Sequence, residues 1–123
     1  MEFDLLSKQV IGCAIEVHRE LGPGLLESAY EKCLLHELQT HNIQSRNQVI
    51  LPVEYKGMHL DAEYRIDLIV ENKLIIELKS VETLLPIHSA QLLTYMKLAK
   101  TKTGLLINFN NKLLKNGIKR LVL

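Results

Sequence analysis

Two acidic and two basic side chains occupy matching positions in the segment Tyr64–Lys79. If Asp67 lies opposite Glu77 on a neighbouring strand, a divalent cation between them would offset their repulsion. A phosphate beside Arg65 and Lys79 would likewise offset the repulsion between these two basic side chains. Opposed like charges repel by a few tenths to about 1 kcal/mol, so two such pairs are a poor choice for structure alone. The alternative is that these four charged side chains simply form the solvent-exposed face of an amphipathic hairpin.

The facing positions follow from a predicted β-hairpin. Two apolar, β-branched runs flank a polar turn at Glu71-Asn72-Lys73, which is a common hairpin connection. This turn places Asp67 opposite Glu77 and Arg65 opposite Lys79. A slip of one residue would expose apolar side chains on both faces, so the pattern selects this register. One face is then wholly apolar and carries Ile66, Leu68, Val70, Leu74, Ile76 and Leu78.

Helical periodicity predicts three helices around this hairpin. The first covers residues 4–21 and ends at Gly22-Pro23-Gly24, because glycine suits a helix cap and proline cannot continue a helix. The second covers residues 25–41, with Leu26 among its expected buried positions. The third runs from Pro86 to about Lys100.

Residues 48–79 are predicted to form a three-stranded antiparallel meander with one buried face. A two-residue turn at Lys56-Gly57 joins the first two strands and places Leu51 opposite Ala62. Pro52 marks the first strand as an edge strand or the site of a bulge. Two further strands are predicted over Gly104–Phe109 and Ile118–Leu123.

Length and composition indicate one globular domain over residues 1–123. A chain of 123 residues can bury a core without disulfide bonds or a structural metal. Contents of 47% hydrophobic and 24% charged residues are ordinary for a soluble protein. No apolar run reaches the roughly 18 residues of a membrane span, and the acidic N-terminus does not resemble a signal peptide. Cys13 and Cys33 lack metal-ligand spacing and are expected to be buried thiols. We expect a cytoplasmic protein.

The charges are distributed unevenly along the chain. Residues 1–82 carry a net charge of −6, whereas residues 83–123 carry +7 and no acidic residue. A basic final third could form a surface that follows a phosphate backbone. The alternative is a solvated lysine face balanced by the acidic helices. The basic residues of this third are Lys97, Lys100, Lys102, Lys112, Lys115, Lys119 and Arg120.

The start of the second helix carries Gly24, Glu27 and Tyr30, each three residues apart. Glu27 and Tyr30 therefore share a helical face. Glu27 also lies in the first turn, where the helix dipole favours a carboxylate. It is either a dipole partner or a third acidic group aimed at the hairpin.

The third helix carries His88, Gln91 and Tyr95 on one stripe, which is either plain surface or part of a site. The ordered set of Asp67, Glu77-x-Lys79 and Gln91-x-x-x-Tyr95 on these elements resembles the PD-(D/E)XK nuclease superfamily. More narrowly, Gly24-x-x-Glu27-x-x-Tyr30 resembles the signature of the small bacterial GxxExxY proteins.

The resemblance covers nearly the whole chain. It implies an α/β fold with a restriction-endonuclease-like core, in which a central mixed β-sheet is flanked by α-helices. The sheet would combine the antiparallel three-stranded meander with a further strand. Asp67 follows Ile66 rather than the proline of the superfamily motif, but that proline is not a metal ligand.

The resemblance also implies residue roles. Asp67 and Glu77 would bind Mg²⁺ or Mn²⁺, with Glu27 completing the acidic cluster, and Lys79 would orient or activate the attacking water. These four residues form the predicted catalytic set. The predicted substrate-binding residues are Gln91, Tyr95, Tyr30, Arg65 and Lys97, and His88 is a weaker candidate for a phosphate contact.

We therefore expect a metal-dependent nuclease that hydrolyses phosphodiester bonds in nucleic acid, with DNA as the expected substrate and no membrane association. One alternative is a catalytically silent nuclease-fold module that binds nucleic acid or a protein partner. A second is a structural domain whose charges are merely solvated. A homodimer is one arrangement that the sequence leaves open.

Overall fold

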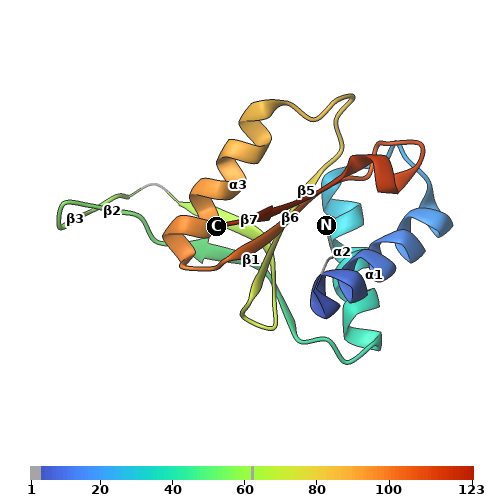
Figure 1. Cartoon of the computed structure of the whole chain (residues 1–123), viewed down its shortest axis with the longest axis horizontal. Coiled ribbons are helices and arrows are strands. Elements are labelled where there is room, and N and C mark those ends of the chain that lie inside the picture. The colour runs from blue at the N-terminus through green and yellow to red at the C-terminus, as the bar shows by residue number, and fades with distance from the viewer. Residues whose placement is uncertain (1–3, 62) are drawn as a thin grey trace.

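The computed structural model describes residues 4–61 and 63–123. A β-sheet lies between two helices on one side and a single helix on the other (Figure 1). The elements, in chain order, are α1 (Leu5–Leu21), α2 (Glu27–Thr40), β1 (Ser45–Leu51), β2 (Glu54–Tyr55), β3 (Met58–His59), β4 (Tyr64–Val70), β5 (Leu74–Lys79), α3 (Pro86–Ala99), β6 (Thr103–Asn108), the short 3-10 helix η1 (Leu114–Gly117) and β7 (Ile118–Val122).

The main sheet has five strands in the order β1-β4-β5-β6-β7. Strands β5 and β6 are parallel and are connected by α3, whereas the other neighbouring strands are antiparallel. The sheet is therefore mixed, which confirms the predicted fold class, including both C-terminal strands. Within the described residues, no helix has the length and apolar character needed to cross a membrane.

Each face of the sheet has its own apolar core. Val10, Leu34 and neighbouring residues of α1 and α2 pack with alternate side chains of the central strands. On the other face, Leu92 and Met96 of α3 pack with Ile75 and other strand residues. Strand β5 is buried on both faces, as expected for a strand covered by helices on both sides.

The turn between β4 and β5 has the predicted form. Lys73 donates its N–H to the Val70 carbonyl at 3.0 Å, and Glu71 and Asn72 have φ values of 53° and 54°. Positive φ at both central residues is typical of hairpin turns whose twist matches that of the strands. The pairs Val70–Leu74, Ile69–Ile75 and Leu68–Ile76 confirm the predicted register near the turn.

The register predicted for the preceding hairpin is wrong in the main sheet. Leu51 pairs with Tyr64, and its predicted partner Ala62 lies outside the described residues. The ladder stops at Pro52, which has no N–H to continue it. Strands β2 and β3 and the Lys56-Gly57 turn form a separate two-stranded arm that projects from the sheet (Figure 1). The shift is two residues. The predicted single apolar face is also wrong, because Leu51 and Ile66 pack on the α3 side of the sheet whereas Leu68 and Val70 pack on the side of α1 and α2.

Tyr30 is a core residue rather than a surface residue, so its predicted substrate contact is wrong. It is fully buried and stacks on Phe109, with ring centroids 4.4 Å apart. Its hydroxyl donates to the Gly22 carbonyl at 2.6 Å and accepts the Leu25 N–H at 3.0 Å. Tyr30 thereby holds the loop between α1 and α2 in place.

The same loop explains a second difference from the predictions. Helix α2 begins at Glu27 rather than at Leu25, because Leu26 has an extended backbone, with φ −70° and ψ 151°. Leu26 is 77% exposed instead of buried. Helix α1 ends as predicted, with Gly22 as its C-cap in the left-handed region at φ 72°.

Replacing Tyr30 with Phe should lower the free energy of unfolding by about 1 to 2 kcal/mol, because two main-chain groups lose their partner. Urea denaturation would measure the change. Tyr55→Phe is the matched control, since Tyr55 is 59% exposed in the arm and should tolerate the same change. Equal stability of the two variants would contradict the loop-anchoring role of Tyr30.

Candidate active site

The candidate site lies where β4 and β5 separate. Their last ladder pair on this side is Leu68–Ile76. Beyond it, Asp67 Oδ2 accepts the Leu78 N–H at 2.8 Å, and the Asp67 N–H donates to Glu77 Oε1 at 3.4 Å. A carboxylate thus replaces the main-chain acceptor of the neighbouring strand. The structure brings Asp67 and Glu77 together, as the predicted register requires.

The Asp67–Glu77 pair is electrostatically unfavourable without a cation. Glu77 is only 6% exposed, and its burial, together with the charge of Asp67, raises its pKa to about 9. Burial also raises the pKa of Asp67, although the hydrogen bond from Leu78 opposes the shift. At neutral pH the pair therefore retains a proton. A divalent cation would supply positive charge in the same position.

These two carboxylates fit Mg²⁺ or Mn²⁺ better than they fit a closed structural metal site. Within residues 4–61 and 63–123, no group of three His, Cys, Asp or Glu side chains is placed to hold a metal ion. Mg²⁺ is commonly bound by one or two carboxylates and keeps several water molecules or substrate oxygens. Asp67 and Glu77 match that donor set.

Glu27 does not complete a three-carboxylate cluster, contrary to the prediction. It is exposed in the first turn of α2, and its charge still contributes to the raised pKa of Asp67. Glu31, one turn further along α2, contributes to the same shift. Sequence reasoning missed Glu31, although its spacing of four from Glu27 places both on one helical face.

Lys79 ends β5, half-buried, and its positive charge opposes the upward pKa shift of Glu77. Its carbonyl accepts the Phe109 N–H at 2.9 Å, and its strand neighbour in β6 is Asn108. The backbone of Lys79 is therefore fixed by β6. This placement beside Glu77 matches the predicted Glu-x-Lys arrangement.

Asn108 fixes the segment that follows Lys79. It is 1% exposed, and its side chain accepts the Val81 N–H at 3.0 Å and donates to the Val81 carbonyl at 2.9 Å. It also donates to Asn111 Oδ1 at 2.9 Å. Sequence reasoning missed this residue. The available signal was a polar side chain at the end of the apolar run Gly104–Phe109.

Gln91 and Tyr95 form a polar pair on α3. Gln91 Nε2 donates to Tyr95 Oη at 3.2 Å. Burial raises the pKa of Tyr95, and the charge of Glu77 raises it further. Tyr95 also makes an edge contact with Tyr64, with ring centroids 6.5 Å apart. The pair therefore lies on the α3 side of the carboxylates, where the sequence predicts it.

Arg65 does not lie opposite Lys79, so this predicted pair is wrong. The β4–β5 ladder ends before Arg65, whose partner in the main sheet is Ile50 of β1. Arg65 Nη2 instead forms an ion pair with Glu63 at 2.9 Å. The opening of the sheet at Asp67 is the physical reason, because it separates the two strands beyond that point.

Two other candidates on α3 have different surroundings from those predicted. His88 Nδ1 accepts the Leu85 N–H at 3.0 Å and so caps the helix. Lys97 is exposed in the last turn, at the end of α3 that leads into Thr103. Thr103 pairs with Leu74 at the start of β5, whereas the carboxylates and Lys79 lie toward its end. The structure does not bring Lys97 into the site.

Comparison with protein families supports the same assignment as the geometry. A model described as the PD-(D/E)XK nuclease superfamily matches residues 4–121. Comparison with curated proteins and with solved structures gives no significant match. The matched range contains both members of the carboxylate pair and every element of the fold except the last residue of β7.

The metal-free protein should lose stability as the pH rises. The pKa of Glu77 is about 9 in the folded state against an ordinary value of 4.5, so the folded state favours the protonated form. The corresponding stabilisation is complete below about pH 4.5 and is lost progressively up to about pH 9. Glu77→Gln should remove this decline and unfold at higher denaturant concentration at pH 8.

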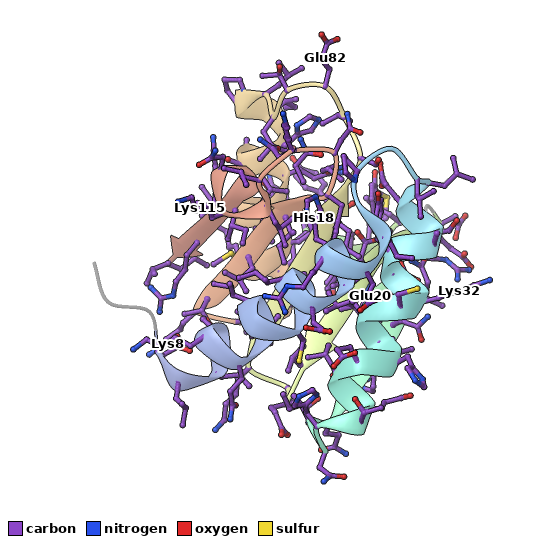
Figure 2. The ribbon with its side chains drawn as sticks, turned by 90° about the vertical axis from the view of Figure 1, so that its right-hand side faces the viewer. Lys8, His18, Glu20, Lys32, Glu82 and Lys115 are labelled. Atoms are coloured by element: carbon purple, nitrogen blue, oxygen red, sulfur yellow. The ribbon has the colours of Figure 1, made fainter. Side chains whose placement is uncertain are left out.

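Urea unfolding across this pH range in a chelating buffer would measure the effect. Glu82→Gln is the control, because Glu82 projects from the surface of the loop after β5 (Figure 2). A wild-type protein whose decline matches that of Glu77→Gln would show that the buried pair does not retain a proton.

Proposed function

Because the chain belongs to the PD-(D/E)XK nuclease superfamily, we propose that it hydrolyses phosphodiester bonds in DNA with Mg²⁺ or Mn²⁺ as cofactor. The observation that carries this proposal is the buried Asp67–Glu77 pair with Lys79 two residues beyond it. Gly24, Glu27 and Tyr30 further support a place among the GxxExxY proteins, although Tyr30 serves the fold rather than the substrate.

The two carboxylates have the role of metal ligands in this proposal. A bound cation supplies a nucleophilic water and stabilises the charge that develops on the phosphate. Asp67 is oriented for ligation by the Leu78 N–H, which binds only one of its two oxygens. Glu77 would give up its proton on binding a cation, because the cation would replace the proton as the neutralising charge.

Lys79 acts on the substrate side of the pair. Its ammonium group lies close enough to Glu77 for their charges to interact, and its main chain is held by β6. A fixed positive charge beside the scissile phosphate stabilises the transition state without reorganisation. Gln91 and Tyr95 provide further hydrogen-bonding groups on the α3 side.

The exposed lysines of the final third fall into two groups along the sheet. One group lies in the last turn of α3 and in the segment that leads into β6. The other follows the end of β6, which lies beside Lys79. Arg120 belongs to neither, because it forms an ion pair with Asp4 at 2.7 Å. The group near the site is Lys112, Lys115 and Lys119, and the distant group is Lys97, Lys100 and Lys102.

Lys79→Ala should lower the cleavage rate by about 10²- to 10³-fold while leaving DNA affinity nearly unchanged, because Lys79 acts mainly in the transition state. Cleavage of single-stranded, duplex and branched DNA with Mg²⁺ and with Mn²⁺ is the assay. Lys32→Ala is the control, since Lys32 projects from the outer surface of α2 (Figure 2).

Two outcomes of this assay would count against the proposal. A wild-type cleavage rate in Lys79→Ala would show that this lysine has no catalytic role. Salt-dependent DNA binding by a wild-type protein that cleaves none of these substrates with either metal would favour the catalytically silent binding module.

Binding to duplex DNA should weaken with salt, with a slope of log affinity against log salt near −3. Three phosphate contacts from Lys112, Lys115 and Lys119 would give this value at about −0.9 per phosphate. Replacing all three with Gln should make the slope much shallower. The same replacement at Lys97, Lys100 and Lys102 should change it little, and fluorescence anisotropy would compare the two. Equal effects of both triple variants on the slope would contradict the assignment of the phosphate contacts to Lys112, Lys115 and Lys119.

A further inference from the structure

Gln48 has an unusual backbone conformation for a residue within a strand. Six non-glycine residues in the described ranges have positive φ, and Gln48 has a φ of 49°. The other five lie in turns or at the ends of helices. Gln48 lies in the middle of β1, between the pairs Asn47–Leu68 and Val49–Ile66. Positive φ in a residue with a side chain is unfavourable and often marks a functional position.

The conformation changes the direction of the Gln48 side chain. Successive side chains of a regular strand point to opposite faces, yet Asn47 and Gln48 both reach Glu31 of α2. Gln48 Nε2 donates to Glu31 Oε1 at 2.6 Å, and Asn47 Nδ2 donates to Glu31 Oε2 at 3.3 Å. Two consecutive residues thus hold one carboxylate.

Gln48 also contacts the candidate site. Its Nε2 lies 3.5 Å from Asp67 Oδ1, which is a long contact beside the short bond to Glu31. Gln48 faces Asp67 across the β1–β4 ladder, because the flanking pairs keep one register. The two N–H groups of a single amide are therefore directed at carboxylates from α2 and β4.

We propose that Gln48 is a positioning residue that holds Asp67 in its metal-binding orientation by tying it to Glu31. The inference rests on the nuclease function proposed above. Asp67 has one oxygen fixed by the Leu78 N–H, and Gln48 restrains the other. Carboxylates that bind metals are commonly held by such outer hydrogen bonds. A neutral amide can serve both carboxylates, whereas a glutamate at this position would repel them.

Two variants distinguish the effect of losing the Gln48 amide from the effect of relieving its backbone strain. Gln48→Gly and Gln48→Ala both remove the amide, but only glycine adopts positive φ without strain. Both should weaken Mn²⁺ binding to the otherwise intact protein by about tenfold or more, measured by calorimetric titration without DNA. Gln48→Gly should also melt at a higher temperature than Gln48→Ala. Asn47→Ala is the matched control, because it removes a bond to Glu31 without affecting Asp67.

Each alternative result has a distinct meaning. Unchanged Mn²⁺ affinity in both Gln48 variants, with a wild type that binds Mn²⁺, would overturn this inference and leave the proposed nuclease function standing. An equal loss of Mn²⁺ affinity in Asn47→Ala would also overturn it. Hydrogen bonding to Glu31, without any contact to Asp67, would then be enough to explain the effect. A wild type that binds no Mn²⁺ would overturn the metal site of the proposed function and this inference together.

A second measurement uses the metal-free protein. Glu31→Ala, Gln48→Ala and the double variant form a mutant cycle for unfolding stability. We expect the double variant to be less destabilised than the sum of the single variants, because both remove the same 2.6 Å bond. Additive effects would show that the bond does not couple α2 to β1 and would overturn the proposed tie.

Discussion

The site depends on a single hydrogen bond, the one from the Leu78 N–H to the Asp67 carboxylate. A buried main-chain N–H must find an acceptor, and in a sheet the neighbouring strand normally supplies it. Here the ladder between β4 and β5 ends at Leu68, and the side chain of the preceding residue, Asp67, takes over that function. The sheet can therefore open without leaving the Leu78 N–H unpaired. The opening in turn creates the space in which Glu77 meets Asp67.

Much of the fold could be predicted because local patterns and the final packing agree. The Glu71-Asn72-Lys73 turn sets the β4–β5 register by its own geometry, and Gly22 ends α1 where a left-handed residue is needed. The β1–β4 register could not be read in the same way. Its connection runs through the arm, so no tight turn links the two strands. Hydrophobic alternation cannot distinguish registers two residues apart, and it does not reveal that the positive φ of Gln48 interrupts the alternation of β1.

The candidate site was only partly predictable for a similar reason. Asp67 and Glu77 could be paired because both belong to one hairpin, whereas the contacts of Tyr30 and Asn108 lie outside any repeating pattern of helix or strand. A tyrosine beside a signature glutamate gives no sign that its hydroxyl will bind Gly22 and Leu25. Likewise, nothing local shows that Asn108 will bind the segment after Lys79. Buried polar partners of this kind become visible only when the chain is folded.

The arm has a consequence for how the length of this chain can change. The chain leaves the main sheet at Leu51 and returns at Tyr64, and these two residues are direct partners in the ladder. The distance between the two ends is therefore fixed by the sheet and is independent of what connects them. Segments inserted or removed here alter neither the five-strand register nor the carboxylate pair. The arm is thus the natural point at which a recognition element can be exchanged or a second domain inserted while the Asp67–Glu77 pair stays unaltered.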